Sequence, residues 1–110
     1  MKPWLLLSLA IVAEIIATTS LKLSLGFTRT LPSVVVVVGY GAAFWLESLT
    51  MKALPLGLTY AIWSGAGTVG AVIIGALIWQ EALTPARLVG MGLIVVGVAV
   101  LGIYGKGHGQ

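Results

Sequence analysis

The chain has 110 residues, of which 59% are hydrophobic and 8% are charged, and its formal net charge is +3. Soluble domains carry roughly 25% charged residues, so this composition indicates a membrane protein with a single small domain. The chain has no Cys, which excludes disulfides and thiolate metal sites, and we expect neither a metal nor a cofactor. The few basic residues form no stripe, so nucleic acid is not an expected partner.

Four prolines stand where long apolar runs begin: Pro3, Pro32, Pro55 and Pro85. Proline suits the first turn of a helix, because its missing N–H would have no partner inside the helix there. Each run is roughly 19 to 25 residues long, enough to cross a hydrocarbon layer of about 30 Å. The sequence therefore predicts an all-α fold, with residues 1–110 forming one domain of four transmembrane helices. The expected helices cover residues 3–21, 32–51, 55–79 and 85–104, and Thr84 is the expected N-cap of the last.

The first apolar run carries one charged residue, Glu14, near its middle. A charge at that depth costs at least about 2.5 kcal/mol, so an acid placed there usually has a function. Steps of three and four residues bring other side chains to the same helix face: Leu7, Ala10, Ile11, Ala17, Thr18 and Leu21. The small members of this set leave space for a ligand, although small residues also let helices pack closely. We interpret Glu14 as a shared binding point for a proton and a cationic substrate.

The second run carries another acid, Glu47, near its end. The sequence leaves two roles open for it. Glu47 can pair with Lys52 or reach the membrane interface, or it can stand at the mouth of a pocket with Tyr40 and Phe44, which share its helix face.

The third run places Tyr60, Trp63 and Gly67 on one face. Aromatic faces attract cations, and a desolvated cation–π contact can be worth about 2 kcal/mol. Gly65 and Gly67 make this helix easy to bend, which predicts a hinge, although glycines also permit close packing.

The fourth run has a stripe without polar groups, formed by Gly90, Ile94, Gly97 and Leu101. Such a stripe is typical of helix–helix contacts and predicts self-association. Basic residues are divided three against three between the two expected sides of the membrane, so the positive-inside rule selects no orientation. Insertion in both directions and a fixed topology both remain open on charge alone.

Several segments together resemble the small multidrug resistance family, in particular its EmrE-like branch. They are Ala-Glu-Ile-Ile-Ala-Thr-Thr-Ser-Leu-Lys around Glu14, Gly-Phe-Thr-Arg from Gly26, Tyr-Ala-Ile-Trp-Ser-Gly-Ala-Gly from Tyr60, and the pair Gly90 and Gly97. The resemblance covers essentially the whole chain. It implies a multi-pass protein of the bacterial inner (plasma) membrane that forms an antiparallel, dual-topology homodimer.

The resemblance also implies a function, namely proton-coupled antiport that exports bulky hydrophobic and quaternary ammonium cations, driven by the proton gradient. Proton and substrate would compete for Glu14. The pocket would be lined by Tyr60 and Trp63 with Tyr40, Ala43 and Phe44. Gly90 and Gly97 would make the dimer contact, and Gly65 with Gly67 the hinge.

The sequence departs from the family pattern at Leu25, where relatives commonly have an acid, at Glu47, where they tend to be apolar, and at Ala43, where they often carry Ser. Guanidinium exporters of the family typically have Trp where this chain has Ala17, which favours bulky cations. The stretch from Gly67 to Val72 instead looks like the guanidinium branch, so export of guanidinium compounds is the alternative. A structural or regulatory membrane subunit is a further alternative. An enzyme is not expected, because no nucleophile–base pair, metal cluster or phosphate loop is present.

Overall fold

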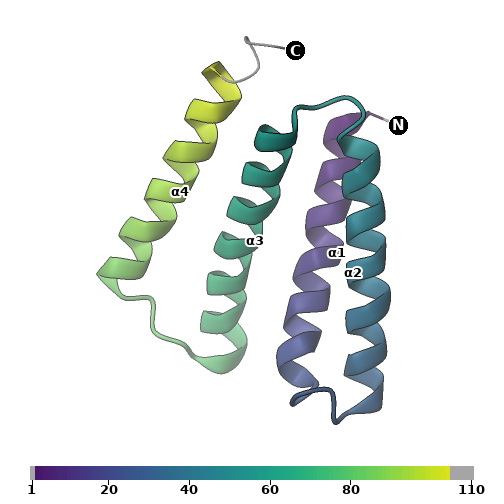
Figure 1. Ribbon diagram of the computed structural model, residues 1–110. Helices are drawn as coiled ribbons and strands as arrows, with labels where there is room; N and C mark the ends of the chain where they lie inside the picture. The colour runs from purple at the N-terminus through teal and green to yellow at the C-terminus, as the bar shows by residue number, and fades with distance from the viewer. Residues whose placement is uncertain (1, 105–110) are drawn as a thin grey trace. The chain divides into compact units, whose positions relative to one another are not determined.

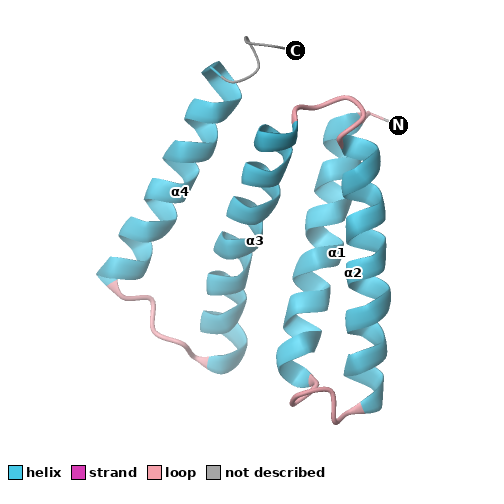
Figure 2. Cartoon of the chain, viewed as in Figure 1, coloured by secondary structure: helices cyan, strands magenta, loops and turns pink. Residues whose placement is uncertain are grey.

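The computed structural model describes residues 2–104, and within them all regular structure is helical (Figures 1 and 2). The helices are α1 (Pro3–Leu23), α2 (Thr30–Thr50), α3 (Leu56–Trp79) and α4 (Pro85–Tyr104). All four are long and apolar enough to span a membrane. The all-α class and the four predicted spans are confirmed. Residues 1 and 105–110 of the expected domain lie outside the described range.

The chain divides into two compact units, residues 1–53 and 54–110, and each is a hairpin of two antiparallel helices. Whether they form the single domain that the sequence predicts stays a prediction. Helix bounds differ from expectation by at most two residues. The largest differences are that α1 ends at Leu23 and that α2 begins at Thr30, two residues before Pro32. Proline fits anywhere in a first turn, because the first N–H groups of a helix have no intrahelical acceptor.

The two helices of the first hairpin come into close contact at Gly39 of α2. A Cβ atom built on Gly39 would lie 2.8 Å from Cβ of Ala17 and 3.3 Å from the carbonyl oxygen of Ala13. There is therefore no room for even a methyl group at this position. The contact fixes the register of α2 against α1 in the middle of both helices.

Ser24 organises the turn between α1 and α2. Its buried hydroxyl donates to the carbonyl of Leu21 at 2.7 Å and accepts the N–H of Phe27 at 3.1 Å. Leu25, Gly26 and Phe27 all have positive φ, at 50°, 73° and 65°. Side chains disfavour this left-handed region, so the hydrogen bonds of Ser24 hold a turn that only Gly26 adopts freely.

In the second hairpin, Thr84 caps α4 as predicted, since its Oγ1 accepts the N–H of Arg87 at 3.2 Å. The guanidinium of Arg87 also donates to the carbonyl of Ala82 at 2.8 Å, which ties the connection to the start of α4. The helices meet at Gly65, where a Cβ would lie 3.0 Å from Cγ2 of both Ile94 and Val98.

We predict that Gly39→Ala destabilises the protein by about 1 to 3 kcal/mol, because the added methyl group overlaps Ala17. Gly41→Ala is the matched control: its Cβ would meet nothing within 4 Å, and alanine is the better helix former. Thermal unfolding in detergent, followed by circular dichroism, compares the two variants. Equal midpoints would contradict the close contact at Gly39.

Candidate functional site

The carboxylate of Glu14 lies in a short chain of hydrogen bonds that joins α1 to α2. Thr18, one turn further along α1, donates its hydroxyl to Oε2 of Glu14 at 3.0 Å. The same Oγ1 lies 2.6 Å from the hydroxyl oxygen of Tyr40 on α2. Because Thr18 has one hydroxyl proton and gives it to Glu14, Tyr40 is the donor in the second bond. The phenol, the hydroxyl and the carboxylate are thus polarised in one direction, towards Glu14.

Glu14 has a hydroxyl partner but no basic one. It is half-buried, and no ion pair joins it to Lys or Arg within residues 2–104. A carboxylate in an apolar helix is stabilised by a proton or by a nearby positive charge. The described part of the chain supplies no basic side chain to Glu14.

Four further members of the expected lining lie on the inner face of the first hairpin. Leu7, Ala10, Ala17 and Ala43 are all buried. Ala17 fills the contact with Gly39, so its small size serves helix packing there. The sequence analysis allowed two roles for the small residues of this face, close helix packing and space for a ligand.

The aromatic residues of the expected pocket form two pairs, one in each hairpin. Tyr40 and Phe44 are stacked, with ring centroids 5.9 Å apart and planes 17° apart. Tyr60 and Trp63 are tilted, with centroids 6.0 Å apart, and Tyr60 is 58% exposed. Aromatic rings attract cations through their faces, which is why such pairs suit a cation pocket. The Tyr40 pair is linked to Glu14 by the hydrogen bonds of Thr18. The Tyr60 pair lies in the second hairpin.

Glu47 is deeply buried, at 8% exposure, whereas Lys52 is exposed. Its Oε2 has no hydrogen-bond partner among the described residues, and no ion pair with Lys52 is found there. Of the roles that the sequence left open, pairing with Lys52 is therefore not seen.

The expected hinge and dimer residues lie in the second hairpin. Helix α3 runs unbroken through Gly65 and Gly67, and both are buried. Gly90 and Gly97 face open space, since an added Cβ would meet nothing within 4 Å. Ile94 lies against Gly65 of α3, and Leu101 is exposed. The roles in bending and dimer contact stay predictions.

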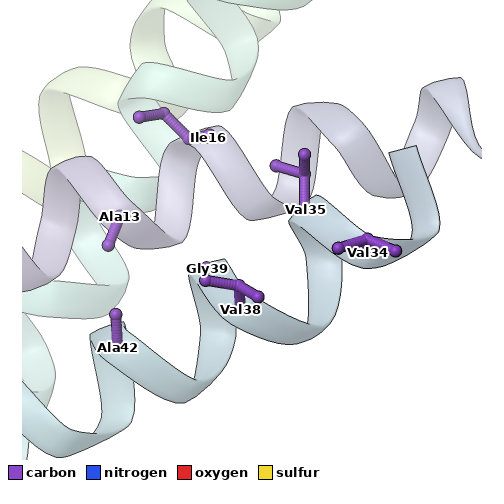
Figure 3. A pocket seen from close by; sticks show the side chains of 7 residues that line it. All are labelled: Ala13, Ile16, Val34, Val35, Val38, Gly39 and Ala42. Atoms are coloured by element: carbon purple, nitrogen blue, oxygen red, sulfur yellow. The ribbon is translucent and has the colours of Figure 1, made fainter. Parts of the chain in front are cut away.

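An apolar pocket of about 360 Å³ lies on another part of the first hairpin (Figure 3). Ala13 and Ile16 of α1 line it together with residues of α2: Val34, Val35, Val38, Gly39 and Ala42. Ala13 and Ala42 point toward each other across it. None of the residues expected to line a cation pocket belongs to it. A pocket of hydrocarbon groups offers no compensation for a charge, so it does not serve as the cation site. The sequence did not predict this pocket, because the valines of α2 that line it read only as part of an apolar membrane span.

A half-buried carboxylate in a hairpin of membrane-length helices defines a class, the multi-pass membrane protein with an intramembrane ionisable site. Comparison with known proteins specifies it further. Residues 2–94 match the family model described as Small Multidrug Resistance protein. The chain belongs to this family, whose members are transporters, and it is therefore a multi-pass transport protein of the inner membrane and not an enzyme.

Individual relatives match along almost their whole length. The chain is 51% identical to the quaternary ammonium compound-resistance protein QacE of Escherichia coli, covering 96% of each. It is 44% identical to a multidrug transporter of Pseudomonas aeruginosa over the full length of both chains. It is 47% identical to the multidrug resistance protein EbrA of Bacillus licheniformis, covering 91% of this chain and 95% of that protein.

We predict that Thr18→Val and Tyr40→Phe are coupled in their effects on stability by about 1 kcal/mol, because both remove the same hydrogen bond. A double-mutant cycle on the free energy of unfolding measures this coupling. Thr19→Val is the control partner for Tyr40→Phe, because the Thr19 hydroxyl donates to the carbonyl of Ile15 on its own helix. Additive effects of Thr18→Val and Tyr40→Phe would refute the bond.

Proposed function

We propose that this protein is a proton-coupled antiporter that exports bulky hydrophobic and quaternary ammonium cations, with proton and substrate competing for Glu14. The observation that carries the proposal is the state of Glu14, a carboxylate in mid-helix with a hydroxyl donor and no basic partner in the described chain. The names of the relatives, which refer to resistance to quaternary ammonium compounds and to multiple drugs, support the choice of substrate.

The mechanism follows from the cost of an unpaired charge. When the site is empty of substrate, a proton on Glu14 removes the charge from the apolar surroundings. An incoming cation stabilises the ionised carboxylate instead and releases the proton. Because one carboxylate cannot hold both, the two ligands exclude each other. Alternating exposure of the site to the two sides of the membrane then couples export of the cation to entry of protons.

The hydrogen-bond chain has a defined part in this exchange. Thr18 stabilises ionised Glu14 by donating to it, and Tyr40 strengthens that donor by donating to Thr18 in turn. These neutral donors moderate the cost of the charge without satisfying it as a lysine or arginine would. The ring faces of Tyr40 and Phe44 supply further attraction for an organic cation.

An antiparallel homodimer is part of the proposal. No described residue of α4 is buried within the chain, and most of its large side chains are exposed, including Leu93, Val96 and Ile103. The expected stripe of Gly90 and Gly97 leaves room for another helix to approach. Two copies inserted in opposite directions would bring together two copies of Glu14, consistent with the even division of basic residues along the sequence.

The test is transport by the purified protein alone, in liposomes with an imposed pH gradient. We expect uptake of tetraphenylphosphonium against the proton flow, and we expect Glu14→Gln to reduce it to the level of empty liposomes, because the amide binds neither a proton nor a cation. Glu81→Gln removes one negative charge outside the site and is the matched control, which should retain transport.

The same assay separates the alternatives. Guanidinium transported in preference to tetraphenylphosphonium would favour a guanidinium exporter, to which the stretch Gly67–Val72 has some resemblance. No transport of either cation by the wild-type protein would favour a structural or regulatory subunit. Coupled transport that persists in Glu14→Gln would refute the role of Glu14.

A further inference from the structure

Glu47 is the second carboxylate of the first hairpin, and the proposed exchange at Glu14 makes no use of it. It lies in α2 on the face that is turned inward, together with Val36, Ala43 and Thr50, which are also buried. The spacing of these residues, by seven, four and three, keeps them on one side of the helix. Glu47 therefore does not point to lipid.

The buried oxygen of Glu47 has nothing to bind in the described chain. Its Oε2 is without a hydrogen-bond partner. The neighbouring hydroxyl of Thr50 is already committed, since it donates to the carbonyl of Leu46 at 2.9 Å. Lys2 and Lys52, the basic residues at this end of the hairpin, are both exposed. An ionised carboxylate in such surroundings is costly unless a positive charge or a proton joins it.

The register of the hairpin puts Glu47 on the same face as the Glu14 site. Tyr40, which reaches Glu14 through Thr18, precedes Glu47 by seven residues, or two helical turns. Both side chains thus leave α2 on one side, and Glu47 lies about 10 Å further along the axis at about 1.5 Å per residue. Because α1 and α2 are antiparallel, Glu47 is level with the turn of α1 that contains the buried Leu7 and Ala10.

We propose that Glu47 is a second cation-binding carboxylate, which takes the distal positive charge of dicationic organic substrates whose first charge is held at Glu14. The inference rests on the proposed function of Glu14 and extends it to a substrate class. The fit requires two positive charges separated by about two helical turns, roughly 10 Å. Monocations bind at the Glu14 site and do not need Glu47.

The test compares three probes for binding to the purified protein in detergent. Hexamethonium carries two trimethylammonium groups on a six-carbon chain, and hexyltrimethylammonium has the same chain with one. The third probe joins two trimethylammonium groups by two carbons, too short to reach both acids. We expect wild-type protein to prefer hexamethonium to hexyltrimethylammonium, and to show no such preference for the short dication.

The variants assign the preference to Glu47. In Glu47→Gln we expect the ratio of hexamethonium to hexyltrimethylammonium affinity to fall by at least about tenfold, as when a buried charge pair loses one partner. Glu47→Asp keeps the charge and should retain part of the preference. Glu81→Gln, the matched loss of charge in the other hairpin, should leave the ratio unchanged.

Two results would overturn the proposal, one of which needs no variant. Wild-type protein with no preference for hexamethonium, or Glu47→Gln with the wild-type ratio, would exclude Glu47 as a cation site. Failure of the proposed function looks different, because binding of hexyltrimethylammonium would then survive Glu14→Gln. A loss of that binding in Glu14→Gln, with an unchanged ratio in Glu47→Gln, would remove only the role of Glu47.

Discussion

The structure depends on the cost of keeping a carboxylate among hydrocarbon side chains. Glu14 sits in the middle of a helix that is long and apolar enough to span a membrane, and the described chain gives it the hydroxyl of Thr18 instead of a countercharge. A salt bridge would satisfy the carboxylate permanently and make it inert. A hydroxyl lowers the cost of the charge without neutralising it. In the proposed mechanism this incomplete stabilisation is what lets Glu14 exchange a proton for a cation.

The geometry that supports Glu14 comes from the smallest residues of the hairpin. Gly39 lets α2 approach Ala17 so closely that no methyl group fits between them. At that distance the phenol of Tyr40, the next residue, reaches Thr18 on the neighbouring helix. Backbone packing and side-chain chemistry are therefore linked, since a wider spacing of the helices would break the hydrogen-bond chain. In a membrane, where apolar side chains gain little by leaving lipid, such close contacts are a main source of helix association.

The sequence predicted what depends on local pattern. Long apolar runs and their prolines placed all four helices within two residues, and Thr84 was recognised as a cap from its position before Pro85. It did not predict what depends on the register between helices. The bond from Tyr40 to Thr18, the packing of Ala17 on Gly39 and the burial of Glu47 away from Lys52 each require knowing which turn of α1 meets which turn of α2. Small residues are especially ambiguous, because the same alanine suits ligand space and helix contact.

The most direct test of the central claim is the binding of tetraphenylphosphonium to the purified protein across a pH series, with proton release followed in weakly buffered detergent solution. If proton and cation compete for Glu14, affinity weakens as the pH falls, binding releases protons, and both effects vanish in Glu14→Gln. Cation binding by the wild-type protein that is independent of pH and releases no proton would contradict the account.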